Sequence, residues 1–371
     1  MKPYIALFVV VLVVPVRAEV AFAPIGVPPP GDPQNPPFSD AYGVANNGTV
    51  AGSMYVPGTG FRSFRWTSAT GLVDIGVLTP TSGSFARAIT PDAQVIVGES
   101  TNPNVAYRKI GNNPLENLSF PQTGDYDQSA AYDVSDNGLA IAGLLSRVAD
   151  GTYRAARWHQ NTGWQDLGVL NPDDYESVAN TISADGSMLA GYSAGNRFSA
   201  FRWTAADHMT ELMNPFGSFD AAAIAMSAPG SVITGQARNA QGLSQAVVWY
   251  GDGSSRVLNL LAGFDTASGF GISGDGTLVG GSVAIDQVGA DRAVFWTADG
   301  QVNDLAAFLN THGINTTGWS FTAITEVSQN GQYLTGRGID PAGYMDSFLV
   351  QIPEPATLAL LLAACTLRRR G

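Results

Sequence analysis

Short apolar runs and tight polar turns alternate along almost the whole chain, and one such phrase occurs seven times. Each copy has an apolar step, a polar pair, a turn centred on residues such as Asn-Gly or Asp-Gly, and a second apolar run that ends in glycine. The copies span residues 43–52, 88–98, 133–143, 181–191, 225–235, 271–281 and 326–336. Their closing glycines are 44 to 55 residues apart, and this period indicates one repeated supersecondary unit.

The phrase itself predicts a β-hairpin. Asn-Gly and Asp-Gly pairs accept positive φ at both central positions of a two-residue turn, and β-branched or apolar residues flank them. The second copy has Asp92-Ala93 at this place and the fifth has Pro229-Gly230, so we expect a different type of turn there.

Two further strand-like phrases follow the hairpin in most copies. One of them ends in tryptophan in five copies, at Trp66, Trp158, Trp203, Trp249 and Trp296. The other is a short run such as residues 72–78 or 164–170. Four short strands in about 46 residues predict one blade of a β-propeller. We expect the recurrent tryptophans to pack between blades, because they are the largest apolar side chains at a fixed place in each unit.

The two ends of the chain complete the count of strands. Residues 22–28 match the third phrase but precede the first hairpin, and residues 347–351 match the second phrase with no third phrase after them. We therefore predict an all-β, seven-bladed β-propeller of four-stranded blades, in which the N-terminal strand completes the last blade and removes its exposed edge. A six-bladed ring is the alternative if that strand does not close the fold.

The first 18 residues have the features of a secretory signal peptide. Lys2 precedes an apolar stretch over residues 5–14, and Ala18 is the expected cleavage point. The alternative, a membrane anchor, is disfavoured because the apolar run is too short to span a bilayer. Cys365, near the C-terminus, is the only cysteine. We therefore expect an exported domain without disulfides, held together by its core and by closure of the ring.

The C-terminal segment combines a Pro-Glu-Pro motif, an apolar run over residues 356–367 and an arginine cluster, with the marker residues Pro353, Glu354, Pro355, Arg368, Arg369 and Arg370. It resembles the PEP-CTERM sorting signal of exported bacterial proteins. The resemblance implies removal by an exosortase-type membrane protease, transient membrane contact through this segment, and a location at the cell surface or in the extracellular matrix of a Gram-negative-type bacterium. The apolar run has 12 residues, fewer than the roughly 20 that span a bilayer, and a frayed hydrophobic tail is the alternative.

The repeat resembles the HAF family of extracellular repeats, whose units carry a His-Ala-Phe-type strand and an Asp-Leu-Gly-type strand. The resemblance spans residues 38–351, although Ser199-Ala200-Phe201 lacks the histidine. It implies no established catalytic residues. We divide the chain into a signal peptide (1–18), a propeller (19–352) and a sorting segment (353–371).

Charge and composition narrow the range of partners. The formal net charge is −12, and loss of the two terminal segments would remove five basic residues and one acid, which takes it to −16. Such an acidic surface repels phosphate backbones, so we expect no nucleic-acid partner. His159, His208 and His312 lack metal-ligand spacing and no phosphate-binding loop is present, so we expect neither a metal nor a cofactor.

Candidate ligand-binding residues lie in the loops that enter the blades. These loops share an aromatic residue followed by an acid, at Tyr126-Asp127, Tyr175-Glu176, Phe219-Asp220 and Phe264-Asp265. In a ring we expect them to converge around the channel mouth, where aromatic faces stack on sugar rings and carboxylates accept hydrogen bonds from sugar hydroxyls. In the alternative interpretation each aromatic is a packing wedge, because equivalent positions in repeats serve the shared core.

These patterns favour a non-enzymatic binding or structural module for extracellular polysaccharide or protein. The alternative is a polysaccharide-active hydrolase or lyase that uses loop acids such as Asp125, Asp127, Asp173, Asp174 and Glu176. Glycoside hydrolysis requires two carboxyl groups about 5–10 Å apart. An enzyme should show inward-facing acids or a His–Arg–Tyr group, drawn from several blades and unlike their repeat equivalents. A binding module should show a shallow, repetitive face.

Overall fold

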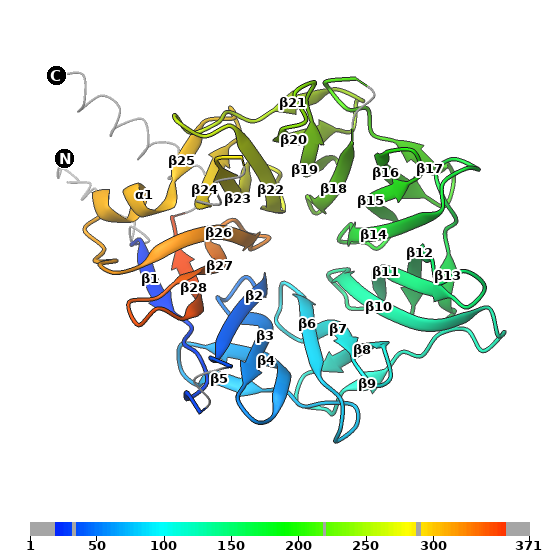
Figure 1. Ribbon diagram of the computed structural model, residues 1–371, viewed down its shortest axis with the longest axis horizontal. Coiled ribbons are helices and arrows are strands. Elements are labelled where there is room, and N and C mark those ends of the chain that lie inside the picture. Colours follow the sequence, from blue (N-terminus) through cyan, green and yellow to red (C-terminus); the bar gives the residue numbers. More distant parts are fainter. Residues whose placement is uncertain (1–18, 32–34, 218–219, 287–290, 354–371) are drawn as a thin grey trace, which may run out of the picture.

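The computed structural model describes residues 19–31, 35–217, 220–286 and 291–353, and these form a ring of seven four-stranded antiparallel sheets (Figure 1). The strands of each sheet are hydrogen-bonded in sequence from the axis outwards, except that the last sheet takes its outer strand from the N-terminus. The prediction of a seven-bladed β-propeller is confirmed, and the six-bladed alternative is excluded.

Each blade has an innermost, a second, a third and an outer strand. The innermost strands of blades one to seven are β2 (Phe38–Val44), β6 (Ser84–Ile89), β10 (Tyr126–Val134), β14 (Glu176–Ile182), β18 (Ala221–Met226), β22 (Thr266–Ile272) and β26 (Ser320–Val327). The second strands are β3 (Val50–Val56), β7 (Val95–Ser100), β11 (Ala140–Arg147), β15 (Met188–Ala194), β19 (Val232–Arg238), β23 (Leu278–Ala284) and β27 (Tyr333–Ile339). The third strands are β4 (Gly60–Thr67), β8 (Val105–Ile110), β12 (Tyr153–His159), β16 (Phe198–Thr204), β20 (Ser244–Tyr250), β24 (Arg292–Thr297) and β28 (Met345–Gln351). The outer strands are β5 (Gly71–Asp74), β9 (Glu116–Asn117), β13 (Gly163–Asp166), β17 (His208–Glu211), β21 (Ser255–Val257) and β25 (Val302–Asp304), with β1 (Ala21–Pro24) in blade seven.

The ring is closed by β1. It pairs antiparallel with β28, from Ala21 opposite Gln351 to Pro24 opposite Phe348. The ring of Phe22 packs edge-to-face on an aromatic ring of β26, with the two centroids 5.6 Å apart. The last blade is therefore completed by the N-terminal strand, as the sequence predicted.

A short helix, α1 (Leu305–Thr311), follows β25. The carboxylate of Asp304 caps its first turn by accepting a hydrogen bond from the backbone N–H of Ala307 at 2.8 Å. Phe308 and Leu309 of this helix pack into the core between blades six and seven. Within the described ranges, no helix combines the length and apolar character that crossing a membrane requires.

The recurrent tryptophans pack between blades, as predicted. Trp158 of blade three packs with Val97 of blade two, and Trp296 of blade six packs with Val248 of blade five. The indole N–H of Trp296 also donates to the backbone oxygen of Asn259 in blade five at 2.7 Å. Each tryptophan thereby buries a large apolar surface against the preceding blade.

The turn between the first and second strands is not the predicted two-residue turn. In blade three, the backbone N–H of Gly138 donates to the carbonyl of Ser135 at 2.8 Å. Gly138 has a φ of 69°, whereas Asn137 has no positive φ. The hydroxyl of Ser135 accepts from the N–H of Ala140 at 3.0 Å and donates to Asn137 Oδ1 at 2.9 Å. This is a four-residue turn with glycine at its last position, where a type I turn favours it.

The expectation of a different turn in the second and fifth copies is also wrong. Ala93 has a φ of 62° and donates to the carbonyl of Thr90 at 2.8 Å, and Gly230 has a φ of 73° and donates to the carbonyl of Ser227 at 2.8 Å. In both copies the first hydroxyl accepts from the N–H five residues later, as in blade three. The turn therefore does not require an Asn-Gly pair. Six copies begin it with serine or threonine, whereas blade one begins it with Ala45 and still has the bond from the N–H of Gly48 to the carbonyl of Ala45 at 3.0 Å.

Each closing glycine faces a β-bulge in the innermost strand. In blade four, Ala179 pairs with Gly191 and Thr181 pairs with Ala190, so Asn180 is the extra residue. A Cβ atom at Gly191 would lie 1.9 Å from the carbonyl oxygen of Val178. The corresponding distance is between 1.9 and 2.3 Å in all seven copies. This close backbone approach is the physical reason why every phrase ends in glycine.

The turns are linked to one another around the axis by backbone hydrogen bonds. In blades three to seven they run between equivalent turn residues at 2.8 to 3.0 Å, from Asp136 to Ala184, then to Ala228, Gly274 and Gln329. A further bond of 2.9 Å joins Asn46 to Pro91. Pro91 has no N–H to continue the series. Blades seven and one are joined instead through a side chain, since the N–H of Asn330 donates to Asn46 Oδ1 at 2.8 Å.

Candidate functional site

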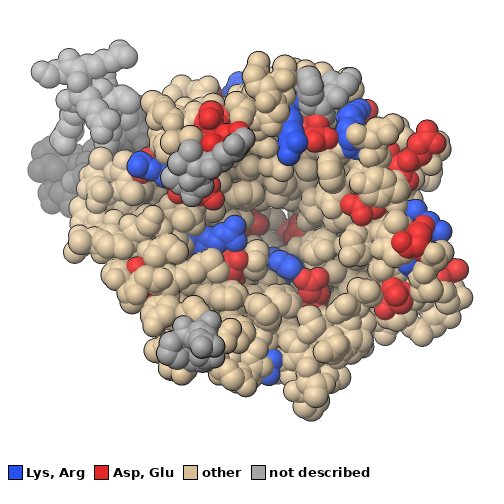
Figure 2. Space-filling model, in the orientation of Figure 1, with Lys and Arg blue, Asp and Glu red and all other residues tan. Residues whose placement is uncertain are grey.

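The loops that enter the blades all open on one face of the ring. Because the strands of each blade are antiparallel, the innermost strands begin on this face, the second strands end on it and the third strands begin on it. We name it the entry face, and we name the opposite side, which carries the glycine turns, the turn face. Figure 2 looks onto the entry face and shows basic and acidic side chains next to one another around a central hollow.

The first predicted pair, Tyr126 and Asp127, lies at the start of β10. The hydroxyl of Tyr126 donates to Asp166 Oδ2 at 2.6 Å, and Asp166 ends the outer strand β13 of the same blade. Burial and the carboxylate of Asp166 raise the pKa of Tyr126 to about 12. Asp127 is exposed, at an irregularity in the pairing of β10 with β11. The Tyr126 hydroxyl is therefore directed to the outer strand.

The second predicted pair presents an exposed ring. The ring of Tyr175 is exposed, and 52% of the residue is accessible to solvent. Its carbonyl accepts a hydrogen bond from Arg154 Nη1 at 2.7 Å, and its N–H donates to the carbonyl of Ala194 at 2.8 Å. Glu176 follows as the first residue of β14. The backbone is anchored at this place while the tyrosine ring faces solvent.

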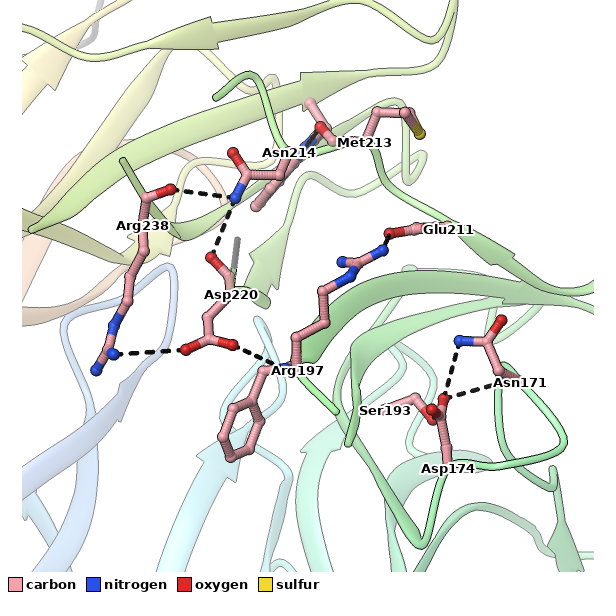
Figure 3. A network of polar contacts seen from close by, with 11 residues as sticks. Asn171, Asp174, Ser193, Arg197, Glu211, Met213, Asn214, Asp220 and Arg238 are labelled. Atoms are coloured by element: carbon pink, nitrogen blue, oxygen red, sulfur yellow. Dashed lines mark hydrogen bonds and ion pairs between the residues drawn. The ribbon is translucent and has the colours of Figure 1, made fainter. Parts of the chain in front are cut away.

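Of the third pair, Phe219 lies outside the described residues, and Asp220 is held in a polar network (Figure 3). The carboxylate of Asp220 accepts from the backbone N–H of Phe198 at 3.0 Å and forms an ion pair of 3.4 Å with Arg238. Asn214 Nδ2 donates to the backbone oxygens of both Asp220 and Arg238 at 3.2 Å. Asp220 thus joins blades four and five.

The fourth pair contributes to packing. Phe264 packs against the core cluster between blades five and six, and the guanidinium of Arg292 lies 5.5 Å from its ring centroid. The carboxylate of Asp265 accepts from the backbone N–H of Asp286 at 2.7 Å. The hydrogen bonds and ring contacts of the described residues link none of the four predicted pairs to another. Their role in ligand binding stays a prediction.

A second group, which is not among the predicted site residues, lies at the extra positions of the bulges in three adjacent innermost strands. Tyr42, Arg87 and Tyr132 occupy these positions in β2, β6 and β10. The guanidinium carbon of Arg87 lies 5.0 Å from the ring centroid of Tyr42 and 6.0 Å from that of Tyr132. The equivalent residues of the other blades are neither basic nor phenolic, namely Asn180, Ile224, Phe270 and Thr325.

Two ion pairs accompany this row. Arg87 Nε donates to Glu99 Oε1 at 3.1 Å, and Arg87 Nη2 contacts the same oxygen. Arg337 Nη1 donates to Asp40 Oδ2 at 2.9 Å, and this oxygen also accepts the hydroxyl of Tyr42 at 2.7 Å. We name these residues together with Tyr132 the rim group. It combines side chains from blades one, two, three and seven.

The phenols of the rim group hold their protons at neutral pH. Burial and the nearby carboxylate of Asp40 raise the pKa of Tyr42 to about 12. Burial, with the charge of Glu99, also raises the pKa of Tyr132. Both residues can therefore donate a hydrogen bond, and neither is set up as a base.

Aromatic rings extend from the rim group across blades one and two. Phe38 stacks on Tyr55 with centroids 6.1 Å apart, and Tyr55 meets Phe61 edge-on at 5.5 Å. Phe61 in turn lies 4.8 Å from Phe85 of the next blade. These rings form a continuous aromatic surface on the entry face.

A cavity of about 290 Å³ adjoins this surface between blades two and three. Its lining includes two tyrosines, a phenylalanine, a carboxylate and two amides, contributed by Phe85, Glu99, Asn104, Gln128, Tyr132 and Tyr153. The amides are linked, because Asn104 Nδ2 donates to Gln128 Oε1 at 3.1 Å. We name this cavity the blade 2–3 cleft. It places aromatic faces and hydrogen-bonding groups around one small volume.

The axis is obstructed near the turn face. Gln329 Nε2 of blade seven donates to Asp136 Oδ1 at 2.7 Å and to Oδ2 at 2.8 Å, so the bonds reach blade three. These two residues also line a cavity of about 100 Å³ together with Asp133 and Glu326. A ligand at the centre is therefore expected to approach from the entry face.

The carboxyl groups in this axial cavity are engaged by the fold. Asp133 Oδ2 accepts from the hydroxyl of Thr181 and the N–H of Ile182, both at 2.9 Å. Burial raises the pKa of Asp133 to about 6, and burial together with the charge of Asp133 raises that of Glu326 well above its usual value. Nowhere in the described part of the chain do three His, Cys, Asp or Glu residues come together in a way that could hold a metal.

The repeat contains a signal for the rim group. Tyr42, Arg87 and Tyr132 each precede a closing glycine by 10 or 11 residues, so alignment of the copies places them at one position. At that position, blades one to three have large polar or aromatic side chains. The sequence did not reveal the bulge, which brings these side chains together.

The comparisons with known proteins support the fold alone. No protein-family model matches the chain, and no curated protein matches it in sequence. Among solved structures, the chain is similar to an oligogalacturonate lyase from Vibrio parahaemolyticus, with a TM-score of 0.56, 9% identity, and coverage of 91% of this chain and 98% of the lyase. It is also similar to a puromycin hydrolase, with a TM-score of 0.58, 11% identity, and coverage of 83% of this chain and 50% of the hydrolase.

A weaker likeness exists to TolB from Acinetobacter baumannii, with a TM-score of 0.47 and 16% identity over 68% of this chain. The chain spans 61% of the length of that protein. Because the identities to the lyase and the puromycin hydrolase are so low, these two likenesses establish only the propeller scaffold.

Proposed function

We propose that this protein is an exported binding module that holds extracellular polysaccharide through the entry face of its propeller. The observation that carries the proposal is the set of exposed aromatic residues on blades one, three and four. Their accessible fractions are 39% for Phe61, 39% for Tyr153, 52% for Tyr175 and 41% for Phe198. Exposed rings beside hydrogen-bonding groups suit sugars, because the C–H face of a sugar stacks while its hydroxyls are bound.

The position of these aromatics supports recognition over general packing. Phe61, Tyr153 and Phe198 each lie five residues before the tryptophan of their repeat. In blades five to seven this place is taken by Ser244, Asp291 and Met345. A packing wedge that the fold required would recur in every blade. These exposed rings are instead confined to blades one, three and four, so the face is not the repetitive one expected of a binding module, and we propose recognition by this part of the ring.

The rim group is the observation that favours the second candidate, a polysaccharide-active hydrolase or lyase. It contains arginine and tyrosine side chains from several blades, and these differ from their repeat equivalents. A proton-abstracting base needs a pKa near the working pH. Tyr42 has a pKa of about 12, and the carboxylates of Asp40 and Glu99 are paired with arginines. Binding is therefore the function that the geometry supports best.

The proposal includes sorting to the cell surface or the extracellular matrix. The cleavage point Ala18 and the sorting residues Glu354, Pro355, Arg368, Arg369 and Arg370 lie outside the described residues, and Pro353 is the last described residue. We propose that an exosortase-type protease removes the C-terminal segment after transient contact with the membrane. The acidic chain repels the phosphate backbone of nucleic acids, and we propose no nucleic-acid partner.

Affinity electrophoresis of the purified full chain in gels that contain soluble polysaccharide tests this proposal. We expect polysaccharide to retard the wild-type protein, and the double variant Phe61→Ala, Tyr153→Ala to lose most of that retardation. Leu139→Ala is the matched control, because Leu139 is 38% exposed but lies beside the turn of blade three, on the turn face. Absence of retardation with every polysaccharide, or an equal effect of the control, contradicts the proposal. Release of new chain ends during incubation would favour the enzyme.

A further inference from the structure

We propose that the blade 2–3 cleft is the subsite that holds one neutral sugar residue of the bound polysaccharide. This inference rests on the proposed function and assigns it a location and a chemical class of ligand. The cleft volume of about 290 Å³ is at the lower end of the range of about 300–1,000 Å³ that is typical of small-ligand pockets. Such a volume suits a single sugar unit with its polymer extending along the entry face.

The cleft is open because the aromatic pair that fills the preceding interface between blades is absent from this one. Between blades one and two, Phe61 packs on Phe85 with centroids 4.8 Å apart and fills the corresponding place. In the next interface the equivalent of Phe61 is Asn104, and the equivalent of Phe85 is Ala130. Both replacements line the cleft. Two aromatic rings are thus replaced by an amide and a methyl group, and space remains between the blades.

The groups around this space have unused hydrogen-bonding capacity. Both contacts from Arg87 go to Oε1 of Glu99, and Oε2 receives no hydrogen bond from a described residue. The hydroxyls of Tyr132 and Tyr153 likewise make no hydrogen bond within the described part of the chain. By contrast, the hydroxyls of Tyr42 and Tyr126 donate to carboxylates. A sugar hydroxyl can donate to Glu99 and exchange hydrogen bonds with both phenols.

The charge of the cleft selects a neutral sugar. Its lining contains one carboxylate and neither lysine nor arginine. That carboxylate, Glu99, forms an ion pair with Arg87. The whole chain also has a net charge of −12. A uronic acid in the cleft would place its carboxylate near Glu99 without a free cation to balance it, and like charges at this range repel.

The test is to fill the cleft with the aromatic pair found between blades one and two. The variant Asn104→Phe, Ala130→Phe recreates the Phe61–Phe85 contact one blade further along the ring. The milder variant Tyr132→Phe, Tyr153→Phe removes only the two hydroxyls and keeps the rings. Ser244→Phe is the matched control, because it adds a phenylalanine at the same repeat position in blade five. Melting temperatures of all variants report on folding.

Binding of the full chain is measured by affinity electrophoresis and titration calorimetry with dextran, laminarin and galactomannan as neutral probes. Polygalacturonate and chitosan oligomers are the acidic and basic probes. We expect the wild type to bind a neutral probe, the filled variant to bind it at least about tenfold more weakly with an unchanged or higher melting temperature, and Ser244→Phe to bind it normally. The variant Tyr132→Phe, Tyr153→Phe should weaken binding by about threefold to tenfold, since hydroxyl groups of the buried sugar lose their hydrogen-bond partners.

Different outcomes overturn different statements. If the wild type binds no polysaccharide, the proposed function is wrong. If it binds a neutral probe but the filled variant and the Tyr132→Phe, Tyr153→Phe variant both bind as tightly as the wild type, the cleft is wrong and the entry-face proposal stands. Binding of only polygalacturonate or only chitosan oligomers contradicts the neutral class. If the filled variant does not fold, the two-hydroxyl variant alone decides, and normal binding by it refutes the subsite.

Discussion

Replacement of the closing glycine in blade five tests why the repeat ends in glycine. Gly235 lies in β19 opposite the bulge of β18, where Ala223 pairs with Gly235 and Ala225 pairs with Thr234. A Cβ atom at Gly235 would lie 2.1 Å from the carbonyl oxygen of Ala222. The shortest ordinary carbon–oxygen contacts are about 3.3 Å. Gly235→Ala must therefore separate the two backbones by about 1 Å.

The cost follows from what lies on each side of this contact. The carbonyl is main chain and cannot rotate away, and protein interiors yield little because they are closely packed. Moving β18 away from β19 weakens several ladder hydrogen bonds, each worth about 1 kcal/mol, and opens the packing beneath them. We expect the free energy of unfolding to fall by about 4–5 kcal/mol, which is at the upper end of single-residue effects. A loss of this size can abolish folding, because total stabilities are only about 5–15 kcal/mol.

Gly251→Ala in the same blade is the matched control. The nearest atom to a Cβ at Gly251 is the carbonyl oxygen of Ser231 at 3.6 Å, which is an ordinary contact, and the backbone there does not need glycine. We expect this change to alter the free energy of unfolding by less than about 1 kcal/mol. Urea unfolding followed by tryptophan fluorescence measures both variants. If Gly235→Ala stays within about 1 kcal/mol of the wild type, the close approach is not what requires the glycine.

Three further predictions concern closure, pH and a buried hydroxyl. Deletion of residues 19–30 should lower the melting temperature sharply, because it exposes the edge of β28 and removes the buried side chain of Ile25. An unchanged melting temperature would contradict closure of the ring by β1. The pKa of Asp133 is raised to about 6, so the folded state binds its proton more tightly than the unfolded chain, and the unfolding free energy should fall by about 1–3 kcal/mol as the pH rises from 4 to 7. Asp133→Asn should flatten that slope in urea titrations, and an unaltered slope would rule out this carboxyl group as its cause. Phe64→Tyr should raise the unfolding free energy by about 1 kcal/mol, because the new hydroxyl can bond to the buried hydroxyl of Ser347, which has no partner in the described structure. The equivalent serine of blade one is hydrogen-bonded to a tyrosine in this way at 2.7 Å. A lower unfolding free energy in calorimetry would show that the new hydroxyl does not reach Ser347.

The repeat made the architecture predictable. Seven hairpins at a regular period implied seven blades, and the unmatched phrases at residues 22–28 and 347–351 implied closure by the N-terminal strand. The tryptophan position implied the packing between blades. The details of the turn were less accessible, because the turn is defined by a backbone hydrogen bond to the residue three before the positive φ, as from Gly138 to Ser135, and several residue types are compatible with it.

The candidate site was harder to predict than the fold. The sequence placed aromatic and acidic residues in the entry loops, but the partners of Tyr126 and Asp220 come from strands that are distant in the chain. The bulge that aligns Tyr42 with Arg87 depends on the register between two strands, and composition does not encode it. The cleft depends on the absence of aromatic rings at Asn104 and Ala130. This absence becomes visible only when the interface is compared with the preceding one, where Phe61 and Phe85 are in contact.

A crystal structure of the full chain with a bound neutral oligosaccharide would show directly where the sugar lies on the propeller. We predict one sugar residue in the blade 2–3 cleft, with its hydroxyls bound to Glu99, Tyr132 and Tyr153. We also predict that the neighbouring sugar units run over the exposed rings of the entry face. A sugar bound on the turn face, or between blades five and seven with an empty cleft, would contradict this placement.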